Sequence, residues 1–335
     1  MQIFKTTLFK TNQLFNTNIN NKDSQQFVTE PIGNNEISKH YYPAFKSNIE
    51  IYEKMKQVSS KNANVEELKK LFEGLTDKAK ENFNGTLKKF DKFGINSETL
   101  LVAFVQKPPL FNRAPETIED NVKRLAEKFK DNGLTVDNYV KACIKAPSLF
   151  GQSPDTIETN VKRLVDKFKE NGLSIDDYIK ACIKKPQLFY QSPDTLESNV
   201  KGLVEKFKED GLSIDDYIKA CIKKPQLFYQ SPETIEANVK GLIEKFKENG
   251  LSIDDYIKAC IKQPPLFCRS SDALESNVKS LVDKFKDNGL TVDDYLKACV
   301  KQPPLFCLSP DTIETNVKGL VDKFKDNGLT AQVFM

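Results

Sequence analysis

The sequence predicts an all-α solenoid, with a right- or left-handed superhelix, built from six 39-residue repeats of two α-helices and a 3₁₀ turn each. A proline recurs with this period and without insertion, at Pro108, Pro147, Pro186, Pro225, Pro264 and Pro303. A glycine does the same, at Gly133, Gly172, Gly211, Gly250, Gly289 and Gly328. Apolar side chains with helical spacing lie between these positions. Such copies cannot bury their apolar faces alone, so we expect them to stack.

The repeat at residues 153–189 illustrates the first helix. Its start combines a serine N-cap, a proline at the first helical position and an acid that suits the positive helix end. One apolar stripe follows at intervals typical of an amphipathic helix: Ile157, Val161, Leu164, Val165 and Phe168. Gly172 is predicted to end the helix, because glycine adopts the left-handed conformation easily.

The second helix of the same repeat is predicted to begin at Ser174, which is followed by acids of the first turn. The residues expected to face inward are Ile175, Tyr178, Ile179, Cys182 and Ile183. Pro186 ends this helix. Residues 186–189 are too short for another α-helix and predict a 3₁₀ turn that places Leu188 and Phe189 under the next first helix.

Three segments are expected along the chain. Residues 1–46 are rich in Asn, Thr and Gln and predict a disordered or targeting-like arm, and the lack of an arginine and of a cleavage signal in its first part favours plain disorder. Residues 47–75 predict a helical N-terminal cap. Residues 76–335 predict the repeat domain, which begins with a diverged copy and is cut mid-repeat at its C-terminal end, where a partner could cap it.

Composition excludes few partners. The net charge of +3 and the pI near 8.3 fall short of the strongly basic balance, above about 9, of an obvious nucleic-acid-binding domain. The apolar runs are far shorter than the roughly 20 residues of a membrane-spanning helix. The seven cysteines predict reduced thiols, as in the cytoplasm or an organelle matrix, and those that recur at the repeat interval are expected to be buried packing residues. A monomer is expected.

Catalysis finds little support in the sequence. The single histidine, His40, lies in the predicted arm, and the chain contains no Gly-rich phosphate loop and no zinc-type Cys/His cluster. The carboxylates occupy helix caps and helix surfaces, where a structural role accounts for them. We therefore expect no enzyme activity, no cofactor and no metal.

Pairs of lysines four residues apart on the predicted second helices are the candidate binding residues. Arg124 and Arg163 make the first two repeats more basic. Stacking would align these pairs into a stripe that could serve about every third phosphate of a strand. The competing interpretation is a solvated surface, in which Asp176 pairs with Lys180 one helical turn away. The complete candidate set is Arg124, Lys141, Lys145, Arg163, Lys180, Lys184, Lys219, Lys223, Lys258, Lys262, Lys297 and Lys301.

Two further sets of positions have both a structural and a functional interpretation. An asparagine of the first helix recurs from Asn82 to Asn316, and we favour a hydrogen bond from its amide to the neighbouring Pro-x-Leu-Phe turn over contact with a ligand. The residues after each Leu-Phe vary between copies, as with Tyr190 and Cys268. Variable residues of this kind can read one base per repeat, but drift in a tolerant loop explains them equally and is favoured.

The repeat resembles that of the mitochondrial transcription termination factor family. The resemblance covers roughly residues 76–330 and depends on Gly172-Leu173-Ser174, Lys185-Pro186-Gln187-Leu188-Phe189 and Ser192-Pro193-Asp194-Thr195-Leu196-Glu197-Ser198-Asn199-Val200. It implies a curved superhelix that binds nucleic acid along a basic face. The expected function is therefore non-enzymatic binding of DNA or RNA along the lysine stripe, in transcription or RNA metabolism. The alternative is a protein-binding scaffold that presents exposed aromatics such as Tyr190 and Tyr229.

Overall fold

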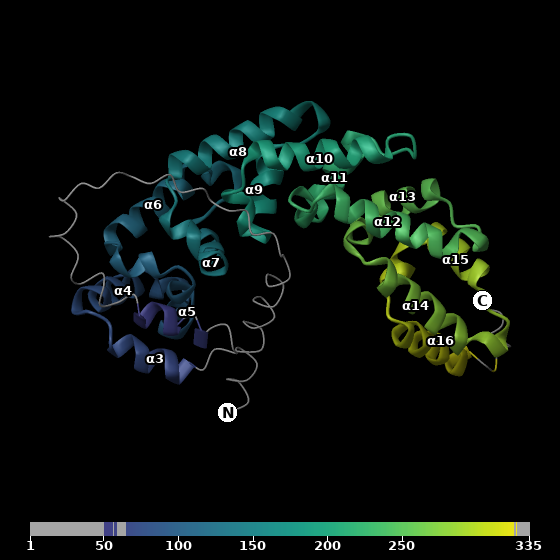
Figure 1. The fold of residues 1–335 in the computed structure, drawn as a ribbon, viewed down its shortest axis with the longest axis horizontal. Helices are drawn as coiled ribbons and strands as arrows, with labels where there is room; N and C mark the ends of the chain where they lie inside the picture. The colour runs from purple at the N-terminus through teal and green to yellow at the C-terminus, as the bar shows by residue number, and fades with distance from the viewer. Residues whose placement is uncertain (1–49, 56, 59–64, 325, 327–335) are drawn as a thin grey trace. The chain divides into compact units, whose positions relative to one another are not determined.

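The computed structural model describes residues 50–55, 57–58, 65–324 and 326. All regular elements among these residues are helical, which confirms the predicted all-α class. The predicted arm at residues 1–46 lies outside the described residues, as do residues 327–335 at the C-terminal end. The described chain forms two compact units (Figure 1): unit 1 extends to Lys130 and includes Leu134–Pro154, and unit 2 comprises Asp131–Gly133 and the residues from Asp155 onward.

The first helices of the repeats have 14 or 15 residues each. They are α4 (Asp77–Phe90), α6 (Pro115–Lys128), α8 (Pro154–Phe168), α10 (Pro193–Phe207), α12 (Pro232–Phe246), α14 (Ser271–Lys284) and α16 (Pro310–Phe324). The second helices have 10 residues each. They are α5 (Ser97–Gln106), α7 (Val136–Lys145), α9 (Ile175–Lys184), α11 (Ile214–Lys223), α13 (Ile253–Lys262) and α15 (Val292–Lys301).

A 3₁₀ turn follows the second helix of each repeat, as predicted, and is called here the proline turn. The proline turns are η4 (Pro108–Asn112), η6 (Pro147–Gly151), η8 (Pro186–Phe189), η9 (Pro225–Phe228), η11 (Pro264–Cys268) and η13 (Pro303–Cys307). Their proline, leucine and phenylalanine side chains are almost all buried. Proline has no N–H and disfavours helical backbone in the residue before it, so the α-helix stops there and the chain tightens.

The structure adds a second 3₁₀ turn that the sequence analysis missed. It follows the first helix in most repeats, at η3 (Asp91–Phe93), η5 (Lys130–Asn132), η7 (Lys169–Asn171), η10 (Lys247–Asn249) and η12 (Lys286–Asn288). In α8 the α-helix therefore ends at Phe168, before Gly172. Gly172 has φ of 89°, and the N–H of Leu173 donates to the Phe168 carbonyl at 3.1 Å. This bond closes the helix end through a left-handed glycine.

The N-caps of the second helices form as predicted. The Ser174 hydroxyl accepts from the backbone N–H of Asp177 at 3.1 Å, and the equivalent serines or threonines cap α7, α11, α13 and α15 in the same way. The buried face of α9 consists of Tyr178, Ile179, Ala181 and Cys182. The predicted inward residues Ile175 and Ile183 are instead half-buried, because the packed stripe is centred on the side that holds Ala181.

Stacking between repeats produces a continuous core within each unit. In unit 2, α10, α12, α14 and α16 pack in succession, and so do α9, α11, α13 and α15 (Figure 1). The Tyr178 ring meets the Phe228 ring of η9, the proline turn of the next repeat, edge-on with 5.6 Å between the ring centroids. The Tyr178 hydroxyl donates to the Leu188 carbonyl of its own repeat at 3.2 Å. Complete burial of each such side chain contributes roughly 1.5–3 kcal/mol. The recurring cysteines are free thiols in this core, as predicted.

The helical residues before the first repeat pack on it within unit 1. They comprise residues 50–55, residues 57–58 and α3 (Val65–Glu73). The Tyr52 ring stacks on the Phe111 ring at 5.5 Å, and the Phe72 ring meets the Phe83 ring at 4.8 Å. These contacts cover apolar side chains that a preceding repeat would otherwise cover.

Candidate nucleic-acid interface

The second helices place their lysines in solvent. Packing buries one side of each helix, so the side chains four residues apart on the other side remain exposed. All ten lysines predicted there are exposed. Lys141 and Lys145 belong to α7 in unit 1. The other eight form what is called here the lysine stripe of unit 2: Lys180, Lys184, Lys219, Lys223, Lys258, Lys262, Lys297 and Lys301.

Few of these lysines have an acidic partner. Lys141 lies 2.8 Å from a carboxylate oxygen of Asp137, and Lys219 lies 4.0 Å from Asp216. Among the described residues, no carboxylate lies within 4.0 Å of the ammonium group of any other lysine in the stripe. The expected ion pair between Asp176 and Lys180 is therefore absent from the described structure.

The acids at the start of the second helices are engaged elsewhere, which explains the missing pairs. Asn171 donates its side-chain amide to Asp215 at 2.9 Å, and Asn249 donates to Asp293 at 2.8 Å. The next acid along the helix accepts from the N-cap hydroxyl, as when Ser213 donates to Asp216 at 2.6 Å. The carboxylates are thus held at the N-terminal end of each second helix, while the lysines occupy its C-terminal half.

One repeat departs from this arrangement at Asp210, where the equivalent position in its neighbours is asparagine. Burial raises the pKa of Asp210, and the nearby Asp254 carboxylate raises it further, against a smaller opposite effect of Lys240. An amide donor has been replaced by a second acceptor that carries the same charge as its neighbour. This contact is therefore weaker than the amide contacts in the adjacent repeats.

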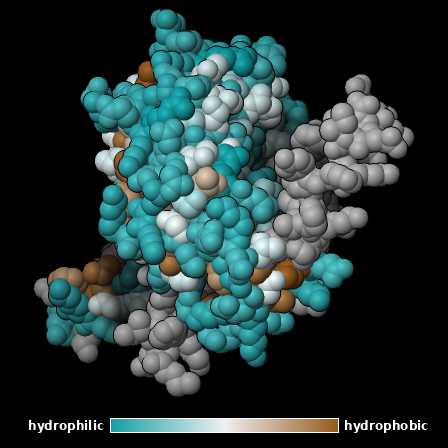
Figure 2. Space-filling view, turned by 90° about the vertical axis from the view of Figure 1, so that its left-hand side faces the viewer, coloured by the Kyte–Doolittle hydropathy of each residue, from teal (hydrophilic) through white to brown (hydrophobic). Residues whose placement is uncertain are grey.

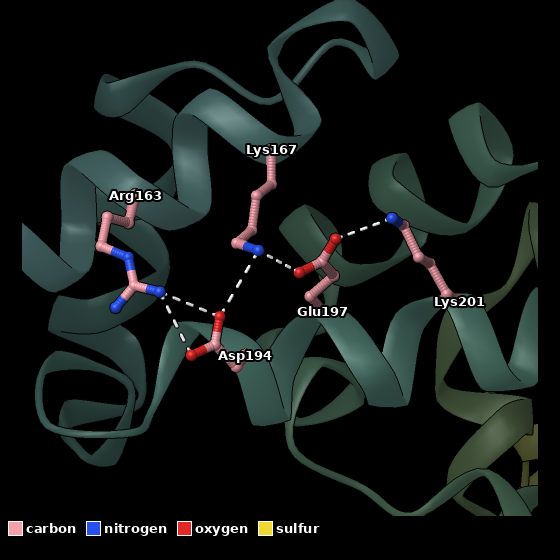
Figure 3. Close-up of polar contacts among 5 residues, drawn as sticks. All are labelled: Arg163, Lys167, Asp194, Glu197 and Lys201. Atoms are coloured by element: carbon pink, nitrogen blue, oxygen red, sulfur yellow. Dashed lines mark hydrogen bonds and ion pairs between the residues drawn. The ribbon is translucent and has the colours of Figure 1, made fainter.

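Most lysines of the first helices have an acidic partner, in contrast to the lysine stripe. A glutamate of α10, α12, α14 and α16 accepts from the lysine four residues later and from a lysine of the preceding first helix, as Figure 3 shows for Glu197 between Lys167 and Lys201. Glu236 repeats this at 2.6 Å from Lys206 and 2.7 Å from Lys240. We call the series in unit 2 the glutamate ladder; its members are Glu197, Glu236, Glu275 and Glu314.

The glutamate ladder neutralises the surface of the first helices. Hydrogen bonds from Lys284 and Lys318 lower the pKa of Glu314 to about 2, and in unit 1 Lys123 and Lys89 do the same for Glu119. Each of these carboxylates is therefore ionised at neutral pH and shared by two ammonium groups. Figure 2 shows one face of the molecule, and most of its coloured area is hydrophilic.

The two predicted arginines lie on first helices and have acidic neighbours. Arg163 donates from one guanidinium nitrogen to both carboxylate oxygens of Asp194, at 3.0 and 3.1 Å (Figure 3). Arg124 lies 3.8 Å from Asp120 on its own helix. Their guanidinium groups are thus less available to a phosphate than the lysines of the stripe.

The asparagines of the first helices bind the proline turns. Asn82 is buried, and its amide donates to the Phe111 carbonyl at 2.9 Å. Asn199 donates to the Phe228 carbonyl at 3.4 Å. At these two positions the structural interpretation is confirmed.

The aromatic residues expected of a protein-binding groove are less exposed than predicted. Tyr190 and Tyr229 follow the proline turns of their repeats, and both are half-buried. Burial raises the pKa of Tyr229 to about 12. The prediction that they are exposed is therefore wrong.

The described residues contain no group of three or more His, Cys, Asp and Glu side chains arranged to hold a metal ion. Burial strongly raises the pKa of Cys182, Cys221 and Cys260, so these thiols are protonated at neutral pH. None of the helices in the described part of the chain is long and apolar enough to span a bilayer.

Comparison with known proteins supports the resemblance noted in the sequence. A search of curated proteins gave no match to the chain. The family model described as mTERF matches residues 46–210 and 197–327, which together cover most of the sequence and all of the repeats described above. This family implies a helical-repeat protein that binds nucleic acid. With its array of paired helices and proline turns, the chain belongs to the mTERF family.

Proposed function

We propose that the protein binds DNA or RNA through the lysines of its second helices and holds the nucleic acid along the repeats without catalysis. The observation that carries the proposal is the difference between the two helix rows of unit 2. Lysines of the first helices share the glutamate ladder, whereas most lysines of the stripe have no carboxylate within ion-pair distance in the described structure. A repeat with almost no net charge can therefore still present exposed lysines on its second helix.

The spacing of the stripe suits a phosphate backbone. Successive second helices in unit 2 pack directly on one another, and packed helices lie about 8–10 Å apart. Phosphates follow one another every ~3.4 Å along one strand of a duplex. One pair of lysines can then serve about every third phosphate. Lys141 and Lys145 of unit 1 carry the same chemistry, while Arg124 and Arg163 are proposed as weaker contributors.

A protein-binding scaffold accounts less well for these features. Such a surface derives its affinity from buried apolar and aromatic side chains, and charged residues are depleted at its centre. The second helices instead present ammonium groups, and Tyr190 and Tyr229 are partly covered. Nucleic acid is the partner that makes use of unpaired, regularly spaced cations.

The test is a titration of the full chain with labelled random DNA and RNA, single-stranded and duplex, at several salt concentrations. Each phosphate contact contributes about 0.7 to 0.9 to the slope of log K against log salt. A Lys180→Gln, Lys184→Gln, Lys219→Gln and Lys223→Gln variant should bind more weakly and lose about 3 from this slope. Wild-type affinity and slope in this variant would refute the proposal.

The glutamate ladder provides the matched control. A variant with Lys201→Gln, Lys240→Gln, Lys279→Gln and Lys318→Gln loses the same formal charge from lysines that are 60 to 68 % exposed but paired. It should retain the wild-type salt slope. An equal loss in both variants would mean that net charge, and not the stripe, determines binding.

A further inference from the structure

The proline turns of unit 2 form a ridge beside the lysine stripe. Turns η11 and η13 pack on each other, and α9, α11 and α13 each contact the proline turn of the next repeat. The residues that follow Leu-Phe in the turns lie along this ridge. We call them the ridge residues of unit 2: Tyr190, Tyr229, Cys268 and Cys307.

Cys307 lies next to Gln263, the residue that follows α13 in the preceding repeat. The Gln263 amide nitrogen is 3.8 Å from the Cys307 sulfur. Burial raises the pKa of Cys268 to about 11, and the charges of Lys224 and Lys185 partly offset this rise. Lys185 and Lys224 immediately follow Lys184 and Lys223, so the ridge adjoins the stripe.

The ridge changes chemically along the array, whereas the stripe does not. Its first two residues in unit 2 are tyrosines and its last two are cysteines, while each of the second helices of unit 2 keeps both stripe lysines. Contacts to phosphate carry no sequence information and can remain constant from repeat to repeat. Contacts to bases differ with the base that is read, so they fall on positions that vary.

Tyr190 and Tyr229 have the polar group such a contact needs. Both rings are half-buried. In the described structure neither hydroxyl is fully buried and neither has a hydrogen-bond partner. A buried tyrosine of the same unit behaves differently, because the Tyr217 hydroxyl donates to the Leu227 carbonyl at 3.2 Å. The ridge hydroxyls are thus held by their rings at a fixed place and remain open toward solvent.

We propose that the ridge contacts the bases of a single-stranded nucleic acid whose phosphates lie on the lysine stripe, with Tyr190 and Tyr229 as the base-contacting residues. The inference rests on the proposed function and adds to it the strandedness of the ligand and the residues that sense its bases. In a single strand each base lies beside its own phosphate and is free to meet such a ridge. In a duplex the bases pair with one another and face inward.

The test uses the full chain and three labelled probes: a 20-nucleotide oligothymidylate, the same strand with abasic sites, and a 20-base-pair duplex. The wild-type protein should bind the oligothymidylate more tightly than the abasic strand or the duplex. A Tyr190→Ala and Tyr229→Ala variant should lose about 5- to 150-fold per base contact on the oligothymidylate, with no change on the abasic strand and no change of salt slope.

Two further variants keep the result interpretable. Tyr190→Phe with Tyr229→Phe removes only the hydroxyls and should cost about 2- to 10-fold for each hydrogen bond. Thr195→Ala changes an exposed residue of α10 that belongs to neither the ridge nor the lysine stripe, and it should leave the affinity within about twofold. Circular dichroism reports whether each variant is folded, and the comparison of wild-type protein on the intact and abasic strands does not depend on any variant.

The two proposals fail in different ways. Equal wild-type affinity for the intact and abasic strands, tighter binding of the duplex, or unchanged affinity of both tyrosine variants would overturn the base-contact inference while the lysine proposal stands. No binding to any nucleic acid, or binding that is insensitive to the stripe lysines, would overturn the proposed function itself.

Discussion

The asparagine of the first helix offers a direct test of whether its repetition serves the fold or a ligand. Asn82 is 3 % exposed and donates to the Phe111 carbonyl at 2.9 Å. Asn82→Ala leaves that carbonyl without this donor. An unsatisfied buried acceptor costs about 1–3 kcal/mol, so the free energy of unfolding should fall by this amount.

Asn199 provides the graded comparison in unit 2. It is half-buried, and its hydrogen bond to the Phe228 carbonyl is longer, at 3.4 Å. Because the site is only half-buried, water can hydrogen-bond to the Phe228 carbonyl in the variant. Asn199→Ala should therefore lower the free energy of unfolding by only about 0.5–1.5 kcal/mol, the net value of an ordinary hydrogen bond. Asn82→Asp should cost at least as much as Asn82→Ala, because it places an acceptor against an acceptor.

The assay is urea denaturation of the full chain, followed by far-ultraviolet circular dichroism, with the nucleic-acid affinity of each variant measured under folding conditions. The expected order of unfolding midpoints is wild type, Asn199→Ala, then Asn82→Ala, with affinity unchanged for Asn199→Ala. The reasoning is refuted if Asn82→Ala unfolds at the wild-type midpoint. A tenfold loss of affinity in a fully stable Asn199→Ala variant would identify the asparagines as ligand contacts instead.

Three further predictions concern stability. Asp210→Asn should stabilise the protein at pH 7, because the folded-state pKa of Asp210 is raised and the favourable contribution of the protonated acid is lost as the pH rises through that pKa. Denaturation at pH 4 and pH 7 should show a larger advantage of the variant at pH 7. Leu242 is 0 % exposed, so Leu242→Ala should lower the free energy of unfolding by about 2–5 kcal/mol. The equivalent Leu320 is 39 % exposed, and Leu320→Ala should lower it by less than about 1 kcal/mol. Equal shifts of the urea midpoint in the two variants would contradict the stacked core. Gly172→Ala should cost about 1–2 kcal/mol by the same measurement, because φ is 89° and nothing lies within 4 Å of an added Cβ to cause a clash; an unchanged midpoint would show that the turn adopts another conformation.

Much of the fold follows from signals between residues close in sequence. Ser174 caps a helix through its neighbour three residues on, and Pro186 stops that helix through its own ring. Because the 39-residue period repeats these local signals, the order of helices and turns can be read directly from the chain. The apolar stripe likewise identifies the core, since helical spacing alone decides which side chains share a face.

The second 3₁₀ turn was missed because its residues, such as Lys169 to Asn171, are compatible with one more turn of α-helix. The left-handed Gly172 and the bond from Leu173 to Phe168 decide the outcome by tightening the chain before the next helix. The sequence shows the glycine at the end of the helix, but it does not show how many residues before that glycine the α-helix stops.

The charge pattern of the candidate site depended on tertiary structure. Sequence spacing predicts an ion pair between Asp176 and Lys180. At the equivalent position of the next repeat, however, Asp215 accepts a hydrogen bond from Asn171, 44 residues earlier. Lys206 likewise donates to Glu236, 30 residues later. Composition and periodicity by themselves determined the repeat, its helices and its buried face, because these depend on neighbours along the chain. Only the stacking of repeats decided which cations are paired and which remain open, because ion pairs form between the side chains that packing brings within about 4 Å.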